Sequence, residues 1–262
     1  MTQSRRLLAA EIGNEHTVLG LLEVTGEEIA VGTHWRVSTD ERRTGDEWGV
    51  LVQGLLAGVP VIGVVVAATV PAVLHEWREM LALHFPDIPH VVVEPGTRTG
   101  LPVLVDNPRE VGADRICNAV AAAHRWGGPV IVVDFGTATT FDVVNARGQY
   151  VGGAIAPGLQ ISLDALDAKG AQLRKVELAR PRSVIAKNTI EALQSGAIHG
   201  AASMVEGIVA RMRAELGAES DPQVISTGHL AGLVAAECTC FTGSAPWLTL
   251  EGLGLIFARQ TH

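Results

Sequence analysis

Cysteine is scarce in this chain, and its scarcity argues against a disulfide-stabilised extracellular scaffold. The 262 residues include 3 cysteines, Cys117, Cys238 and Cys240. This small, odd number makes a poor disulfide framework. No further Cys or His stands at a spacing that would complete a zinc site with Cys238 and Cys240. We therefore expect reduced thiols and a cytoplasmic location.

Long apolar runs and an excess of positive charge are also missing. The longest apolar candidate, 59–70, is broken by Pro60, Gly63 and Thr69, so we expect no membrane span. The basic N-terminal pair Arg5 and Arg6 precedes too short an apolar run for an export signal. The formal net charge is −8 and the arginines are scattered, which argues against a nucleic-acid partner. What remains is a chain with 47% hydrophobic residues, enough for two buried cores.

A glycine turn between two apolar runs, within 129–144, carries most of the functional information. Four apolar residues, 130–133, lead into Asp134, and Gly136 then supplies a turn whose main-chain N–H groups can point outward. Thr137, Thr139 and Thr140 line the turn with hydroxyls. Such a turn can hold phosphate, and a carboxylate beside it can hold the metal ion that accompanies a nucleotide. The alternative is an ordinary tight hairpin with threonines on its solvated face.

A second copy of this pattern lies near the N-terminus. The carboxylate, glycine and threonine of the segment 7–18, which are Glu11, Gly13 and Thr17, precede Asp134, Gly136 and Thr140 by a constant 123 residues (134 minus 11). A constant offset of this size indicates an internal duplication. We expect an α/β fold of two similar halves, divided as 1–118 and 119–262, that face each other across a nucleotide cleft.

Strand and helix patterns alternate along the rest of the chain. Thr69 is a plausible helix cap, and Asn107 before Pro108 predicts a helix start. The expected elements are helices at 44–56, 69–83, 107–126, 188–216 and 248–259, and strands at 61–66, 90–93, 151–157 and 224–229.

The helix expected after Asn107 carries the best candidate for general-base chemistry. At helical spacing its apolar residues fall on one side, and Asp114, Arg115 and Asn118 share the other. One interpretation is a solvated polar face with a charge pair. The other is a carboxylate that takes a proton from a substrate hydroxyl, with Arg115 beside it for an anionic group.

Five motifs stand in the order and spacing of the type III pantothenate kinases, and the resemblance extends from about residue 7 to 258. The motifs are residues 11–14, 112–115, 134–140, 152–158 and 226–228. The resemblance implies the acetate and sugar kinase, heat-shock ATPase and actin superfamily, with two duplicated ribonuclease-H-like (actin-like ATPase) domains. It also implies phosphorylation of pantothenate to 4'-phosphopantothenate, the first step of coenzyme A biosynthesis. The implied enzyme is a homodimer that uses ATP, Mg²⁺ and a monovalent cation, K⁺ or NH₄⁺.

The resemblance also assigns roles to individual residues. It makes Asp114 the general base and Asp134 the ligand of the monovalent cation. The substrate contacts that it implies are Gly112, Ala113, Arg115 and Thr189. The ATP contacts that it implies are Glu11, Ile12, Gly13, Asn14, Glu15, His16, Thr17, Val18 and Thr137.

The chain departs from the family pattern at three positions. Its first motif begins with Glu11 where the family has Asp, Glu15 adds a negative charge near the expected triphosphate, and His229 replaces a usual glycine. These departures leave two alternatives open beside an active pantothenate kinase. One is a pantothenate-kinase-like binding or regulatory protein with weak or no activity. The other is a kinase of a related small hydroxy acid.

Overall fold

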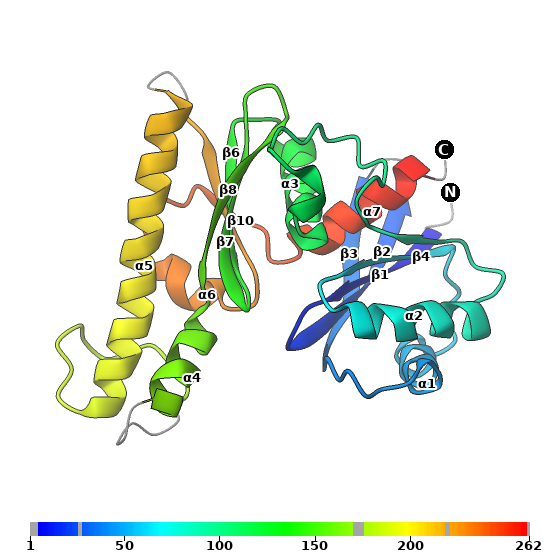
Figure 1. Ribbon diagram of the computed structural model, residues 1–262, viewed down its shortest axis with the longest axis horizontal. Helices are drawn as coiled ribbons and strands as arrows, with labels where there is room; N and C mark the ends of the chain where they lie inside the picture. The colour runs from blue at the N-terminus through cyan, green and yellow to red at the C-terminus, as the bar shows by residue number, and fades with distance from the viewer. Residues whose placement is uncertain (1–4, 26–27, 170–175, 218–220, 261–262) are drawn as a thin grey trace. The chain divides into compact units, whose positions relative to one another are not determined.

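The computed structural model describes residues 5–25, 28–169, 176–217 and 221–260, and the chain divides into two compact units (Figure 1). The first unit comprises Met1–Leu101, Asp106–Ala121 and Trp247–His262, and the second comprises Pro102–Val105 and Ala122–Pro246. The predicted domain boundary between residues 118 and 119 stays a prediction. The compact units place the C-terminal segment with the first unit.

The first unit is built on a five-stranded sheet whose order is β3-β2-β1-β4-β5. Its strands are β1 Arg5–Ile12, β2 His16–Thr25, β3 Glu28–Ser38, β4 Gly63–Ala68 and β5 His90–Val92. Strands β1, β2 and β3 form an antiparallel meander, whereas β4 runs parallel to β1 and β5 parallel to β4. The continuous apolar run of β4 suits a central parallel strand.

Helices α1 (Gly45–Leu56) and α2 (Pro71–His84) cover one face of this sheet, as Figure 1 shows. A capping box between Thr44 and Glu47 starts α1. The two helices meet the sheet through one apolar cluster, in which the fully buried rings of Trp48 and Trp77 lie 5.3 Å apart. This cluster is the core on the α1 and α2 side of the sheet.

Helix α7 (Leu248–Gln260) packs against strands β1 to β4 of the same sheet. The sheet glycines make room for it, because a Cβ built at Gly20 would meet Leu250 and one built at Gly63 would meet Phe257. Strand residues alternate between the two faces of a sheet, and these glycines are out of register with the residues that contact α1 and α2. The C-terminal helix therefore covers the opposite face.

The second unit repeats the first sheet strand for strand, with the order β10-β9-β6-β7-β8. Its strands are β6 Val130–Phe135, β7 Ala138–Val144, β8 Tyr150–Pro157, β9 Gln223–Thr227 and β10 Gly243–Ser244. Strands β6, β7 and β8 form the antiparallel meander, and β9 and β10 are the parallel strands. The same topology in both units confirms the predicted α/β fold and its internal duplication.

The remaining helices are α3 Ala113–Trp126, α4 Leu159–Lys169, α5 Thr189–Leu216 and α6 Ala231–Val234, with 3₁₀ turns η1 Pro108–Glu110 and η2 Ala235–Glu237. The long helix α5, yellow in Figure 1, packs against the second sheet through Ala202, Val205 and Val209. Its N-cap is Asn188, the residue at which the predicted helix 188–216 begins. None of the described helices is long and apolar enough to cross a membrane.

Two predicted helix starts are wrong. Helix α2 has Val70 at its N-cap, and the Thr69 hydroxyl donates to the Ile12 carbonyl oxygen instead, at 3.1 Å. The Asn107 side chain caps only the short turn η1, and α3 begins later, at Ala113. Thr69 bonds to the Ile12 carbonyl oxygen and Asn107 accepts the Arg109 N–H, so neither side chain caps the long helix that follows it.

Candidate active site

The first glycine turn joins β1 to β2 and presents the predicted ATP contacts 11–18. Gly13 donates its N–H to the His16 carbonyl oxygen at 3.0 Å, and a Cβ at Gly13 would lie 3.0 Å from that same oxygen. Glycine is therefore the residue that fits the turn without pushing the hairpin apart. Glu11 and Glu15 are half-buried and Asn14 is exposed, so the turn offers polar groups to solvent.

Two threonines that the sequence reasoning missed as site residues hold this turn in place. The Thr39 hydroxyl donates to the Gly13 carbonyl oxygen at 2.8 Å and lies 2.9 Å from the Thr17 hydroxyl oxygen. Thr69 donates both its N–H, at 2.9 Å, and its hydroxyl to the carbonyl oxygen of Ile12. The sequence could have indicated Thr69, because it follows the apolar run of the strand that lies parallel to β1. No sequence pattern indicated Thr39, because β3 returns to the first glycine turn only in the folded meander.

The second glycine turn joins β6 to β7 and is one residue shorter than the first. Thr17 pairs with Ile12 across the first hairpin, and its counterpart across the second is Thr139, which pairs with Phe135. The predicted equivalence of Thr17 and Thr140 is therefore wrong by one residue. The constant offset holds up to the glycine and then changes, because the first turn contains an additional residue between its strands.

Glycine backbone surrounds the second turn where Asp134 stands. A Cβ at Gly228 would collide with Asp134 Oδ1 and would lie 2.7 Å from the Phe135 nitrogen. The φ angle of Gly228 is +89°, which also favours glycine. A Cβ at Gly158 would collide with the Thr137 carbonyl oxygen and lie 2.7 Å from that of Gly136. The motifs 152–158 and 226–228 thus converge on the turn that carries Asp134 and Thr137.

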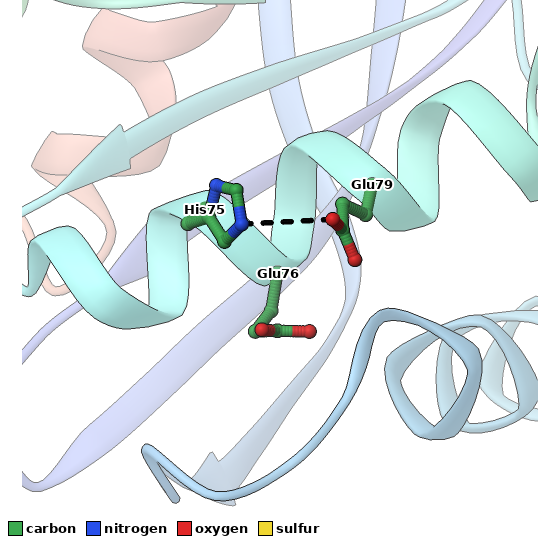
Figure 2. Close-up of side chains that lie close together, drawn as sticks. All are labelled: His75, Glu76 and Glu79. Atoms are coloured by element: carbon green, nitrogen blue, oxygen red, sulfur yellow. Dashed lines mark ion pairs between the residues drawn. The ribbon is translucent and has the colours of Figure 1, made fainter.

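Asp134 is half-buried near the end of β6, and its carboxylate oxygen and the Phe135 carbonyl oxygen both pack against Gly228. Oxygen donors of this kind suit hard cations. In the described residues, three metal-ligating side chains gather elsewhere, at His75, Glu76 and Glu79 on α2 (Figure 2). Glu76 accepts the Gly45 N–H at 2.8 Å, and His75 lies 3.5 Å from Glu79 one helical turn on. These contacts give that surface cluster a structural role at the start of α1.

Asp114 is the second residue of α3, and its carboxylate folds back over Gly112. The Gly112 carbonyl oxygen accepts the Ile116 N–H at 3.1 Å and so starts the helix. A Cβ at Gly112 would collide with Asp114 Oδ1, so glycine leaves the space that this carboxylate occupies. Asp114 and its neighbour Arg115 are both half-buried. The predicted substrate contacts 112–115 therefore form one short segment around the carboxylate.

The Glu11 and Asp114 carboxylates both act on one buried thiol, that of Cys117. Burial is the main cause that raises the pKa of this thiol well above its usual value, and the negative charges of Asp114 and Glu11 raise it further. Glu11, Asp114 and Cys117 all belong to the first unit.

The prediction of a solvated polar face on α3 is wrong for Asn118. Residues 116–122 are all buried, and Asn118 is 1% exposed. Its side-chain oxygen accepts a hydrogen bond from the Thr249 hydroxyl at 2.9 Å. The sequence pattern failed because α7, from the other end of the chain, contacts the polar side of α3.

Thr189, the remaining predicted substrate contact, is the first residue of α5 and is exposed. It belongs to the second unit, as do Asp134 and Thr137, whereas residues 11–18 and 112–115 belong to the first. Near Thr189, Arg182 grips the Glu191 carboxylate with two hydrogen bonds of 2.5 and 3.0 Å. This pair lowers the pKa of Glu191 and fixes the start of α5.

Comparison with known proteins identifies the family of this chain. The family model described as type III pantothenate kinase matches residues 7–211. A type III pantothenate kinase of Nocardioides sp. is 65% identical and covers 97% of this chain and 99% of its own. Its counterpart from Streptomyces griseus is 57% identical, with 97% and 98% covered.

One solved structure supports the fold. The activator of the 2-hydroxyisocaproyl-CoA dehydratase from Clostridium difficile, solved with bound ADPNP, matches with a TM-score of 0.52 and 13% identity. The match covers 98% of this chain and 96% of that one, so the two chains share the fold over nearly their whole length. The family model and the full-length relatives lead to one conclusion: the chain belongs to the type III pantothenate kinase family.

Proposed function

We propose that this chain transfers the γ-phosphoryl group of ATP to the hydroxyl of pantothenate with Asp114 as the general base. The family supplies the activity, because its members are pantothenate kinases, phosphotransferases that open coenzyme A biosynthesis. The observation that supports the assignment of the base is the position of the Asp114 carboxylate, which lies in the first turn of α3 against the main chain of Gly112 and is followed directly by Arg115.

Phosphoryl transfer depends mainly on position and on charge neutralisation. In our proposal Asp114 accepts the hydroxyl proton as the hydroxyl oxygen attacks phosphorus, and Arg115 offers its guanidinium to the pantothenate carboxylate. Gly112 and Ala113 shape the space beside the base, and Thr189 makes a further substrate contact. We assign ATP contacts to residues 11–18 and to Thr137, whose turns present N–H and hydroxyl groups suited to phosphate oxygens.

ATP is used with a divalent metal ion in this kinase family, and the ion neutralises the charge of the phosphates when it is bound. We propose in addition a monovalent cation, K⁺ or NH₄⁺, at Asp134. The Asp134 carboxylate and the Phe135 carbonyl oxygen pack against Gly228, and the carbonyl oxygens of Gly136 and Thr137 pack against Gly158. Carboxylate and carbonyl oxygens are the donors that a hard cation prefers.

The test of the reaction is ADP release by the purified protein with ATP, Mg²⁺ and K⁺. We expect release that depends on pantothenate, with 4'-phosphopantothenate as the second product. Release that is equal with and without pantothenate would refute the proposed substrate. Turnover with another small hydroxy acid but none with pantothenate would favour the related kinase instead. ATP binding without turnover of pantothenate or of any other hydroxy acid tested would favour the binding-protein alternative that Glu11 and Glu15 suggest.

We also propose a homodimer formed through the second unit. That unit exposes several large apolar side chains, among them Ile155 on the edge strand β8, at 65%, and Ile185, at 85%, with Ile190 at the start of α5. Exposed apolar surface of this kind is typical of protein interfaces. Light scattering after gel filtration should give twice the monomer mass of 27.6 kDa. We expect Ile185→Glu to lower that mass, whereas the control Val50→Glu, at an exposed valine of the first unit, should not.

A cytoplasmic location completes the proposal. All three cysteines are free, Cys117 and Cys240 buried and Cys238 half-buried. Free thiols are typical of proteins that work in a reducing compartment.

A further inference from the structure

We propose that helix α7 is a positioning element for catalysis, in which Thr249 and Gly252 fix α3 and thereby the Asp114 carboxylate. The inference rests on the proposed role of Asp114 as the base. All the residues concerned belong to the first unit, and none of the roles that the family resemblance implies falls on α7.

The first contact between the two helices is a buried hydrogen bond. The Thr249 hydroxyl donates to Asn118 Oδ1 at 2.9 Å, and the two residues are 5% and 1% exposed. A hydrogen bond at a buried site is costly to lose, since the remaining polar atom is left without solvent. It therefore ties α7 to α3 at one defined point.

The second contact is an approach of the two backbones. A Cβ built at Gly252 would collide with the carbonyl group of Cys117 and would lie 2.9 Å from the Cys117 Cα. Any side chain at position 252 must therefore push α3 away, because main-chain atoms cannot rotate aside. Gly252 stands one helical turn after Thr249, so both contacts lie on the same face of α7.

These contacts affect the position of the proposed base because Cys117 and Asn118 stand three and four residues after Asp114. Residues at that spacing are neighbours on a helix, so a shift of the backbone at Cys117 also moves the carboxylate one turn earlier. Helix α7 also packs against β1, the strand that carries Glu11. It therefore sets the position of the base relative to the first motif's carboxylate, and a misplacement of about 1 Å is typically worth about 10²-fold in rate.

Thr249 gives the cleaner test, because threonine and valine have nearly the same shape. We expect Thr249→Val to lower kcat by about 10-fold or more while KM for ATP stays unchanged, since the lost bond shifts α3 and not the ATP turn. Thr249→Ser keeps the hydroxyl and should restore most of kcat. Equal kcat for the wild type, Thr249→Val and Thr249→Ser would overturn the inference.

A matched glycine pair on the same helix gives the second test. Gly252→Ala places its Cβ against the backbone of α3, whereas the Cβ of Gly254→Ala meets only side-chain atoms of Ile29 and Leu22. Both variants carry the same chemical change in α7. We expect Gly252→Ala to lose at least about 10-fold more kcat than Gly254→Ala when both are assayed well below their melting temperatures. Equal losses would mean that α7 supports only the fold.

A double-mutant cycle separates this inference from the assignment of the base. If Thr249 acts through Asp114, Thr249→Val should not lower the residual rate of Asp114→Asn any further. Full turnover of Asp114→Asn alone would refute the proposed base. A low rate in Asp114→Asn that Thr249→Val reduces by the same factor as in the wild type would leave the base in place and overturn the positioning role.

Discussion

Replacing Gly112 with alanine moves the Asp114 carboxylate without changing its charge. The new Cβ would collide with Asp114 Oδ1, and no other neighbouring heavy atom would lie within 3.5 Å of the Cβ. Carbon and oxygen atoms need about 3.5 Å between them, so the carboxylate must retreat by about 1 Å. It can do so by rotating its side chain, because the atom in collision is the far end of a flexible group.

The size of the effect on rate follows from that displacement. A misplacement of about 1 Å in a reacting group is typically worth about 10²-fold in rate. We therefore expect kcat of Gly112→Ala to fall by about 10²-fold at saturating pantothenate and ATP. The free energy of unfolding should change little, because Gly112 has no positive φ angle and the collision is relieved by one side chain.

The assay is a steady-state ADP-release measurement together with a thermal melt. Gly54→Ala is the matched control, since Gly54 lies on α1 and a Cβ there meets nothing within 4 Å. That control should keep wild-type kcat and gain up to about 1 kcal/mol of stability from helix propensity. Wild-type kcat in Gly112→Ala would refute the claim that the position of the Asp114 carboxylate limits the reaction.

Three further predictions address the other parts of the site. Glu11→Asp shortens the first carboxylate to the length that the family pattern has, and we expect kcat to rise with little change in melting temperature; a lower kcat at every Mg²⁺ concentration would show that the turn is adapted to glutamate. Asp134→Ala should lower activity in a way that added K⁺ does not restore, because the carboxylate that holds the cation is gone, and an unchanged K⁺ activation curve would place the cation elsewhere. The folded protein should react slowly with a thiol reagent near pH 8, because burial raises the pKa of Cys117 well above its usual value and raises that of Cys238 to about 12, which keeps both thiols protonated. Rapid reaction of Cys117, located by mass spectrometry, would contradict the packing of α3 against α7.

The sequence predicted the architecture well where the pattern is local. The repeated carboxylate and glycine turns anticipated two sheets of the same topology, because each turn ends a buried strand and starts an antiparallel partner. The capped helix after Thr44 and the long helix after Asn188 were equally readable. These features depend on neighbours within a few residues, which the sequence shows directly.

What the sequence could not show depends on contacts between distant segments. Asn118 was predicted to be solvated because its hydrogen-bond partner Thr249 lies far away in the sequence. Thr39 gave no signal because its partner Gly13 lies two strands earlier. The alignment of Thr17 with Thr140 slipped by one residue because a longer turn changes the strand register after the glycine.

The central claim is that Asp114 takes the proton from the hydroxyl of pantothenate. It is tested most directly by the kcat of Asp114→Asn, measured alongside its ATP affinity and melting temperature. An amide keeps the size of the carboxyl group but cannot accept the proton. We expect kcat to fall by about 10² to 10⁴-fold while ATP affinity and melting temperature stay near the wild-type values. A folded Asp114→Asn protein that phosphorylates pantothenate at the wild-type rate would contradict it.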